Sequence, residues 1–383
     1  MNLKNVYFEL IILILLSSNC FAQSWSSPLK VFGFFQASYV HISHLGGVGD
    51  RSSFNTQQLN LFFQKDLTKN WTSFVNFEIL NNYSSNKQWG SMNLEEAWIK
   101  YNCRPEFTLK LGLQIPIFNN LNEIKNRTPL LPYIVRPLAY ESSFGEIMNL
   151  EEMTPERAFF QVNGFIPVSK IKLDYAAYLG NSPNINNNPA NGQTGVDTTD
   201  TYLFGGRLGL RVSDLKFGLS ATYDKSNTYR FIEPVLNVPV RFLEKIQRIR
   251  IGSDLSYDFK SLRLESELIK VNYDDDVKEL VLDKLFYYIT LGYFVDEEFF
   301  IYYSYWLTQM HHNYFDIIDS LYVLKNGEFK IKVSSIGFSY HMTERITFKG
   351  QFSQVKFDIA KELPIFGHIP TENYFSTAVS VFF

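Results

Sequence analysis

After residue 22 the chain has no apolar run that approaches the roughly 18 residues needed by a membrane-spanning helix. Cysteine is nearly absent, because Cys103 is the only one of the two cysteines beyond residue 22. An excess of one charge is also missing, since 36 basic and 39 acidic residues give a net charge of −3. These absences exclude an intramolecular disulfide after residue 22 and a nucleic-acid binder that depends on strong electrostatic attraction.

The first 22 residues are predicted to form a secretory signal peptide. They begin weakly basic, continue in an unbroken apolar run at 10–16, and end at 20–22 in a sequence that resembles a signal cleavage site. The alternative is a lipoprotein signal at Cys20, which would require a small residue directly before it, whereas Asn19 stands there. We therefore expect one folded domain over the rest of the chain, 23–383.

Aromatic residues are abundant, with 23 Tyr, 35 Phe and 5 Trp, and most of the chain alternates apolar with polar residues. The alternation is regular over 107–115, where Phe107, Leu109, Leu111 and Leu113 alternate with polar residues or glycine. A period of two over nine residues is typical of a strand whose faces meet two different environments. The pattern predicts sixteen strands: 30–42, 56–65, 71–82, 91–103, 107–115, 156–168, 170–180, 201–212, 214–224, 247–259, 261–273, 283–295, 298–309, 329–342, 345–357 and 371–383.

The connections between these segments alternate between short turns and longer loops. A short-turn side that carries both chain ends is typical of transmembrane β-barrels, which also spread their apolar residues over many alternating strands. A soluble sandwich would need two apolar faces directed at one core. We therefore predict an all-β, antiparallel transmembrane barrel of about sixteen strands. In the segment 329–342 the alternation changes phase, and a bulge near Ser334-Ser335 would reconcile its two halves.

Residues 116–155 interrupt the strand pattern with five of the 14 prolines, which a central strand does not accommodate. The segment also contains apolar residues such as Leu130, Leu131, Tyr133 and Ile134, so it is not a solvated linker. Loops of this length in a compact fold are usually functional. We expect the 116–155 segment, which follows the fifth strand, to fold into the barrel lumen as a constriction.

Charged residues on the polar faces of the strands, together with those of the 116–155 segment, are the candidate lumen residues. Strands 8 to 10 offer a basic row on one wall, and an acidic segment opposite it would create a field across the channel. Simple solvation of a wet wall is the alternative for each single charge. The candidates for the constriction and lumen are Lys110, Glu123, Lys125, Arg127, Arg136, Glu141, Arg157, Arg207, Arg211, Arg248 and Arg250.

The last strand carries Phe375, Val379, Val381 and Phe383 on one face, and Phe383 is the final residue. A terminal aromatic residue resembles the signature that the barrel-assembly machinery reads, so Phe383 is the candidate assembly signal. The alternative is an ordinary apolar strand end.

The layout resembles the 16-stranded bacterial outer-membrane porins, which have a long inward-folding loop after the fifth strand. Within it, Gly112-Leu113-Gln114, Asn119, Glu123, Arg127-Thr128-Pro129 and Arg136-Pro137 are similar in style to the phosphate-selective porin group. That resemblance implies a pore lined by arginine and lysine runs, whereas the 116–155 segment has three basic and five acidic residues.

Two further clusters and several absent motifs bear on an enzymatic function. His311-His312 is expected in an outer loop at 310–328, where a metal site would need additional ligands. Residues 274–276 are three aspartates, interpreted as an acidic loop tip or as a bridge through divalent cations to lipopolysaccharide. The sequence has no nucleophile elbow, zinc-protease helix, phosphate loop or dinucleotide fingerprint. We expect no metal, no cofactor and no enzyme activity, although barrel enzymes are known.

These observations favour a porin of the bacterial outer membrane that lets small hydrophilic solutes or ions diffuse through a water-filled channel. The main alternative is a surface adhesion or receptor protein that the barrel anchors, and a barrel enzyme is the third. Expected partners are outer-membrane lipids and lipopolysaccharide, the barrel-assembly machinery and two further copies in a homotrimer, with no nucleic acid.

Overall fold

The computed structural model describes residues 27–43, 49–80, 91–140, 153–181, 201–228, 244–274, 281–318, 321–359 and 371–383, so the predicted signal peptide lies outside it. Within these ranges the chain forms sixteen strands. In chain order they are β1 Lys30–Ser43, β2 Arg51–Asp66, β3 Trp71–Leu80, β4 Ser91–Arg104, β5 Phe107–Gln114, β6 Ala158–Val168, β7 Ile171–Asn181, β8 Tyr202–Val212, β9 Leu215–Thr228, β10 Glu244–Phe259, β11 Leu262–Asp274, β12 Val281–Phe294, β13 Phe299–Ile318, β14 Leu321–Thr343, β15 Ile346–Ile359 and β16 Glu372–Phe382.

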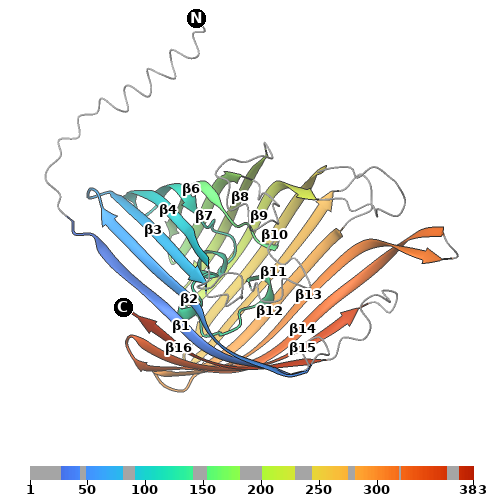
Figure 1. Cartoon of the computed structure of the whole chain (residues 1–383). Helices are drawn as coiled ribbons and strands as arrows, with labels where there is room; N and C mark the ends of the chain where they lie inside the picture. Colours follow the sequence, from blue (N-terminus) through green and yellow to red (C-terminus); the bar gives the residue numbers. More distant parts are fainter. Residues whose placement is uncertain are drawn as a thin grey trace, which may run out of the picture.

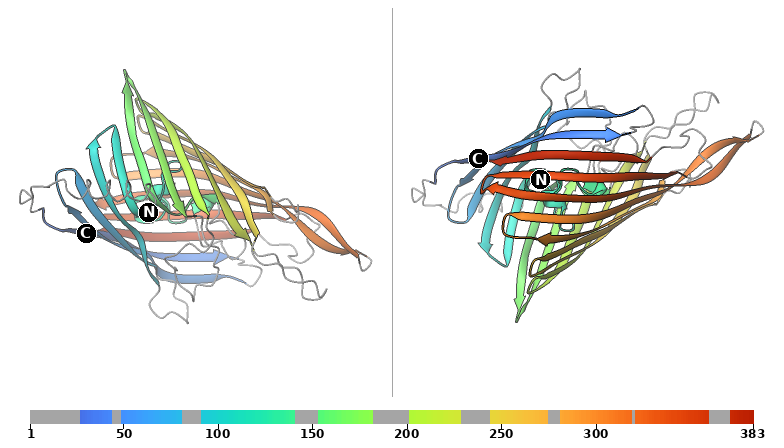
Figure 2. Two further views of the ribbon diagram at one scale, coloured as in Figure 1. Left: turned by 90° about the horizontal axis from the view of Figure 1, so that it is seen from above. Right: turned by 90° about the horizontal axis from the view of Figure 1, so that it is seen from below.

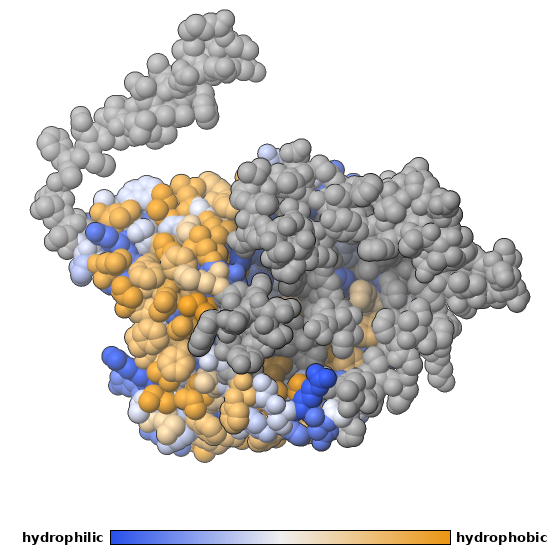
Figure 3. All heavy atoms as spheres, in the orientation of Figure 1, coloured by the Kyte–Doolittle hydropathy of each residue, from blue (hydrophilic) through white to orange (hydrophobic). Residues whose placement is uncertain are grey.

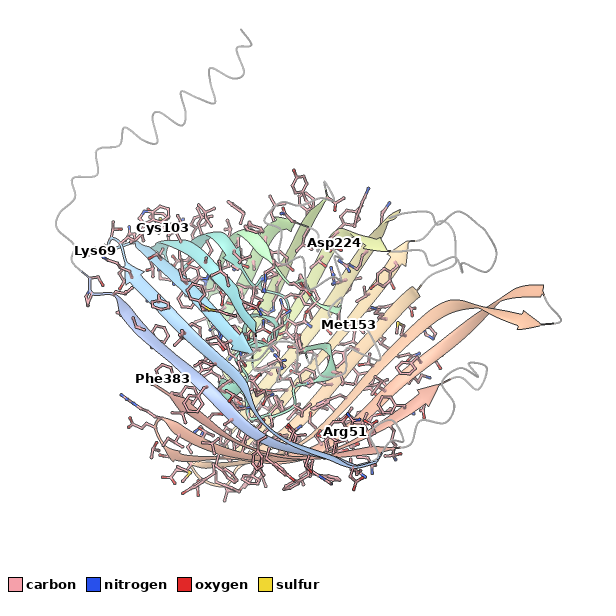
Figure 4. The ribbon with its side chains drawn as sticks, viewed as in Figure 1. Arg51, Lys69, Cys103, Met153, Asp224 and Phe383 are labelled. Atoms are coloured by element: carbon pink, nitrogen blue, oxygen red, sulfur yellow. The ribbon has the colours of Figure 1, made fainter. Side chains whose placement is uncertain are left out.

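The strands form one closed antiparallel barrel in which each strand pairs with its neighbours in sequence. The ring closes between β1 and β16, where Gln36 lies opposite Ser380 and Ala37 opposite Val379. Figures 1 and 2 show the tilted strands around a common axis. In Figure 4, Lys69 and Cys103 mark the rim with the short turns and Arg51 marks the opposite rim. No helix in the described ranges is long and apolar enough to cross a membrane.

Side chains alternate between a buried and an exposed face on most strands, as the sequence pattern predicts. On β16, Phe375 is 48% exposed while Ser376 and Ser380 are 1% and 0% exposed. Figure 3 shows apolar side chains gathered on the outer surface of the barrel. An apolar outer face suits the hydrocarbon of a bilayer. A closed barrel also satisfies its backbone hydrogen bonds between its own strands, so that none is left open to lipid.

Strands β13 and β14 are longer than the sequence pattern predicts. The expected loop at 310–328 is wrong, because β13 continues to Ile318 and β14 starts at Leu321. The prediction that His311-His312 lies in a loop is wrong for the same reason, since His311 pairs with Glu328 of β14. Residues 313–318 pair with 321–326 of β14 and with no other strand of the described chain, and Figure 1 shows this ribbon extending past its neighbours.

The bulge that we predict at Ser334-Ser335 is absent, because β14 pairs continuously there with both β13 and β15. The register shift of β14 lies instead between His341 and Thr343. The alternation does not change phase. Ile331 and Val333 are completely buried on the same face as Ser335, whereas Ile336 is 61% exposed on the other face. Both faces of β14 are therefore apolar, each over a different half of the strand.

Bulges in β2 and β4 bring consecutive side chains to the same side of the sheet. In β2, Gln58 lies opposite Gln36 and Thr56 opposite Ala37, which leaves Gln57 as the extra residue. In β4, Glu96 lies opposite Asn76 and Leu94 opposite Phe77, so Glu95 is extra. An extra residue bends the strand and re-aims its side chains. As a result Glu95 and Glu96 are both buried, at 4% exposure each.

Candidate functional site

The 116–155 segment leaves β5 after Gln114 and contains three short 3-10 turns in its described part: η2 Asn122–Ile124, η3 Thr128–Leu130 and η4 Leu138–Tyr140. Proline accounts for part of this conformation, because Pro129 occupies the first turn of η3, where the missing N–H costs nothing. Residues 141–152, which include the candidate Glu141, lie outside the described residues. The described part contacts buried side chains from strands all around the barrel.

Lys349 of β15 binds the turn η3. Its ammonium donates to the carbonyl oxygens of Thr128, Pro129 and Leu131 at 3.0, 3.1 and 2.6 Å, and to Gln36 Oε1 at 3.0 Å. The lysine is 1% exposed, so these oxygens replace the water that would otherwise solvate its charge. Without Lys349, three buried carbonyl groups would lose this partner.

Glu267 of β11 binds the first part of the segment. Its Oε1 accepts the backbone N–H groups of Asn120 and Leu121 at 3.0 and 2.9 Å, and its other oxygen accepts the hydroxyl of Tyr140. The close approach of the segment to β10 also requires a glycine. A Cβ added at Gly252 would lie 2.3 Å from Asn119 Oδ1. Glu267 therefore holds both η4 and the residues directly before η2 against β11.

Two glutamines on either side of the β1–β16 seam continue the same contacts. Gln351 of β15 accepts the N–H groups of Ile134 and Val135 at 2.7 and 2.9 Å and donates to the carbonyl of Val135 at 3.1 Å. On β2, Gln58 Oε1 accepts the N–H of Thr128 at 3.2 Å. Side-chain amides thus satisfy the segment's backbone much as a neighbouring strand would.

Apolar side chains of the segment pack on the strands from β11 onwards. Phe118, Tyr133, Leu138 and Met153 are completely buried in one cluster with wall residues. The wall residues of that cluster are Ile269, Val271, Phe286, Tyr288, Phe300, Tyr302, Trp306, Phe329, Ile331, Val333, Val355 and Tyr374. Ile331 and Val333, on the buried face of β14, therefore belong to the same apolar cluster as residues of the segment.

Arg127 of the segment and Arg157, just after it, meet the two adjacent acids of β4. Arg127 Nη2 lies 3.1 Å from Glu96 Oε1, and Arg157 Nη2 lies 3.1 Å from Glu95 Oε2. The guanidinium of Arg127 also lies over the ring of Phe62, 5.9 Å from its centroid. Arg136 donates to the carbonyl of Lys125. The bulge in β4 thus supplies one carboxylate to Arg127 within the segment and one to Arg157 directly after it.

Lys110 and Lys125 are the two candidate lysines near the segment. Lys110 of β5 forms a loose ion pair with Glu123, with 3.6 Å between nitrogen and oxygen. Lys125 donates to the hydroxyl of Thr154 at 3.1 Å. Burial lowers the pKa of Lys125 to about 8, although the carboxylate of Glu156 acts in the opposite direction. Lys125 therefore loses its positive charge around pH 8, well below the range of an exposed lysine.

The arginines of the basic row expected on strands 8 to 10 all pair with aspartates of the same wall. Arg207 makes two hydrogen bonds to Asp254, of 3.0 and 2.6 Å, and Arg211 pairs with Asp174. Arg248 and Arg250 share the carboxylate of Asp224, with shortest N–O distances of 2.6 and 3.1 Å. Four arginines of the predicted basic row thus meet three aspartates on this wall. The sequence pattern gives each residue's face, but it does not give its partner across the sheet.

A cavity of about 310 Å³ lies on the short-turn side of the segment, between it and strands β5 to β9. Ile117, Asn120 and Glu123 of the segment form one side of it. Strand residues that line it include Thr108, Asn163, Phe165, Asp174, Arg207, Arg211 and Lys216. The apolar cluster lies on the opposite wall. The cavity with polar lining residues therefore lies beside β5 to β9. We call this space the vestibule.

Most predicted site residues thus lie at the segment or around the vestibule, apart from Arg248 and Arg250, which are buried on the wall. Lys349, Gln351 and Glu95 are missing from the sequence-based prediction. A signal for the first two is present, because residues 347, 349, 351 and 353 form a polar row with a period of two. Glu95 gives no such signal, since only the bulge brings it to the face of Glu96.

Comparisons with known proteins agree with this architecture. A family model described as Gram-negative porin matches residues 10–360. None of the curated protein sequences matches the chain closely enough to count as a relative. Among solved structures, the anion-selective porin from Comamonas acidovorans superimposes with a TM-score of 0.61 at 12% identity, over 94% of this chain and 100% of that one.

Two further solved structures are similar in fold. OprB of Pseudomonas putida gives a TM-score of 0.57 at 13% identity and covers 93% of this chain and 94% of its own. The outer membrane channel DcaP of Acinetobacter baumannii gives 0.55 at 11% identity, with 93% and 97% covered. At these identities the similarity shows a shared fold.

Proposed function

Because this chain belongs to the Gram-negative porin family, we propose that its 116–155 segment narrows the lumen of an outer-membrane diffusion channel. The family and the sixteen-stranded barrel are those of a channel through which small hydrophilic solutes diffuse passively. The bacterial outer membrane is its location. The finer proposal concerns which residues set the width and the charge of the channel.

The observation that carries the proposal is that one segment binds strands far apart in the ring. Gln58 lies on β2 and Glu267 on β11, and both accept backbone N–H groups of the segment. A chain that reaches both strands crosses a barrel whose sixteen strands would otherwise enclose an open aqueous channel. The vestibule is then the space left for solutes on the short-turn side.

We propose that the channel has modest ion selectivity. Arg207 and Arg211 each pair with one aspartate, Arg248 and Arg250 share Asp224, and Arg127 and Arg157 pair with Glu96 and Glu95, so most of these charges are compensated. Charges that cancel in pairs attract neither sign of ion at long range. The remaining influence on ions comes from exposed groups such as Lys216 beside the vestibule.

A second candidate function is contact with other molecules at the cell surface, with the barrel as anchor. The ribbon of β13 and β14 beyond His312 favours it, because its two strands pair only with each other in the described chain. Enzyme activity has less support. His41 lies 2.9 Å from the hydroxyl of Ser52, but no carboxylate of the described residues bonds to His41.

We propose a homotrimer in outer-membrane lipid with lipopolysaccharide, assembled by the barrel-assembly machinery through Phe383. One solved structure of similar fold, OmpT of Vibrio cholerae, is described as a trimer form. On the outer face, a hollow of about 430 Å³ is lined by Ala37, Tyr39, Phe54 and residues of β15 and β16, and Phe54 is 82% exposed. An aromatic side chain beside a hollow of this kind suits contact between copies.

Single-channel recording in planar bilayers tests the proposed function. Purified protein should insert in discrete steps with an ohmic conductance in KCl. The absence of any conductance from protein that is folded, as judged by heat-modifiable mobility in detergent gels, would contradict a channel. In that case the surface-contact function would be favoured.

A further inference from the structure

Three basic residues lie side by side on adjacent strands at the vestibule, and two of them, Arg211 and Lys216, line it. Lys172 of β7 is the register partner of Arg211 of β8, and Arg211 is in turn the partner of Lys216 of β9. Like charges placed directly opposite on one sheet face destabilise the sheet. The row therefore has a cost in the empty channel that a bound anion would offset.

One carboxylate forms an ion pair with this row in the described chain. Asp174 pairs with Arg211, while neither Lys172 nor Lys216 has an ion pair with a carboxylate within the described part of the chain. The next pairs around the vestibule, Lys110 with Glu123 and Arg207 with Asp254, are each neutral. Lys172 and Lys216 are thus the two cations of the row without an ion pair in the described chain, and Glu265 of β11 is an acid that acts on Lys216 through space.

An aromatic ring lies beneath two of the three basic side chains. The ammonium of Lys172 and the guanidinium of Arg211 lie over the ring of Phe165, 5.4 and 5.7 Å from its centroid. Phe165 and Ile117 both line the vestibule, so apolar surface lies next to the charges. Inorganic ions gain nothing from such a surface, whereas a carbon skeleton does. At about 310 Å³ the space lies at the small end of ligand pockets.

We propose that Lys172, Arg211 and Lys216 form a binding site for small organic dianions that enter the vestibule. The shared chemistry is a short carbon chain bearing two negative charges, either as two carboxylates or as one phosphate ester. The charges bind the row, while the carbon chain contacts Phe165 and Ile117. The site deepens the proposed function, on which it rests, because it lies in the space left for solutes beside the segment.

The test is current blockade in planar bilayers with glutarate added on the short-turn side, at about 0.1 M KCl so that screening is limited. Glutarate should interrupt the current in a saturable manner. Glycerol phosphate tests the phosphate-ester source separately. Sulfate, which has the charge without a carbon chain, and glutaramate, which has one charge, should both bind more weakly. Equal blockade by glutarate and glutaramate would overturn the requirement for two charges.

The variant Lys172→Gln/Lys216→Gln should weaken glutarate binding about ten-fold, because two partly exposed charge contacts are lost. Lys65→Gln removes the same charge from an exposed position near the short-turn end of β2 and should leave binding unchanged. Unchanged glutarate binding by the double variant, or an equal loss with Lys65→Gln, would overturn the site.

Calorimetry with glutarate on detergent-solubilised protein separates this proposal from the channel function. Conductance in KCl without blockade and without heat of binding would reject the site and keep the channel. Binding heat without conductance would keep the site and reject the channel.

Discussion

The ammonium nitrogen of Lys349 lies 2.6 Å from the carbonyl oxygen of Leu131, and this contact joins β15 to the 116–155 segment. Two more carbonyl groups of the segment and Gln36 surround the same nitrogen. An ammonium group has three N–H donors, so the four oxygens share them. One buried side chain therefore binds three carbonyl groups in and directly after the turn η3.

Lys349→Met should release this turn. The loss of the ammonium leaves buried carbonyl groups without this partner, which should lower the free energy of unfolding by about 2–4 kcal/mol. The temperature at which the protein loses its folded mobility in detergent gels measures the change, and current noise reports a loosened segment. Lys356→Met is the control, because Lys356 is exposed. Equal behaviour of the two variants would argue against the role of Lys349.

Shortening the segment between about residues 120 and 150 should raise the single-channel conductance. The deletion removes the chain that binds both Gln58 and Glu267, and a sixteen-stranded barrel without it encloses a wider aqueous space. Folding is checked first by heat-modifiable mobility. A folded deletion variant with the parental conductance would place the segment outside the path of the ions.

Replacing Arg127 and Arg136 by glutamate should shift ion preference toward cations. The change removes the partner of Glu96 and adds two negative charges beside the segment. Reversal potentials in a KCl gradient measure the shift, which should shrink as salt rises, because the Debye length falls from about 10 Å at 0.1 M to about 3 Å at 1 M. An unaltered reversal potential at low salt would contradict a role for these residues at the constriction.

Ion preference should also change with pH through Lys125. Burial lowers the pKa of this lysine to about 8, so it is charged below that pH and neutral above it. Raising the pH from 7 to 9 removes one positive charge from the segment and should increase cation preference. Lys125→Met should abolish this step while leaving the barrel folded. A step of the same size in the variant would assign the titration to another group.

Deleting Phe383 should reduce the amount of protein in the outer membrane while export continues. Phe383 exchanges two backbone hydrogen bonds with Gly33, of 2.9 and 3.0 Å, so its backbone completes the β1–β16 seam as well. Phe383→Ala keeps those backbone hydrogen bonds and removes only the aromatic ring. It therefore distinguishes the role of the side chain from that of the seam. Immunoblots of membrane fractions measure the outcome. Parental levels of Phe383→Ala would reject the side chain as an assembly signal.

The period-two pattern of the sequence predicts the barrel well because lipid requires the same alternation on every strand. It fails on β14, where Ile331 and Val333 are buried and Ile336 is exposed on the opposite face. There the apolar partner on the buried side is the 116–155 segment, whose position a local pattern does not contain. The same limit explains the ends of β13 and β14, which continue as a paired ribbon through residues expected to form a loop.

The site could be predicted from the sequence as a set of residues but not as a set of partners. Arg207, Arg211, Arg248 and Arg250 lie on the expected wall, yet each meets an aspartate of the same wall. Which side chains meet depends on strand register, and the single extra residue at Glu95 changes it in β4. Contacts across the barrel, such as those of Lys349, depend on three-dimensional closure.

Cys103 is a natural labelling site that distinguishes the two sides of the membrane. It is exposed near the end of β4, beside the short turns, and no other cysteine occurs after residue 22. A bulky maleimide that cannot cross the bilayer would therefore react from one compartment only, without any engineered residue. The side on which it reacts reports the orientation of each inserted molecule, and a coupled fluorophore would place a reporter at the rim nearest the vestibule.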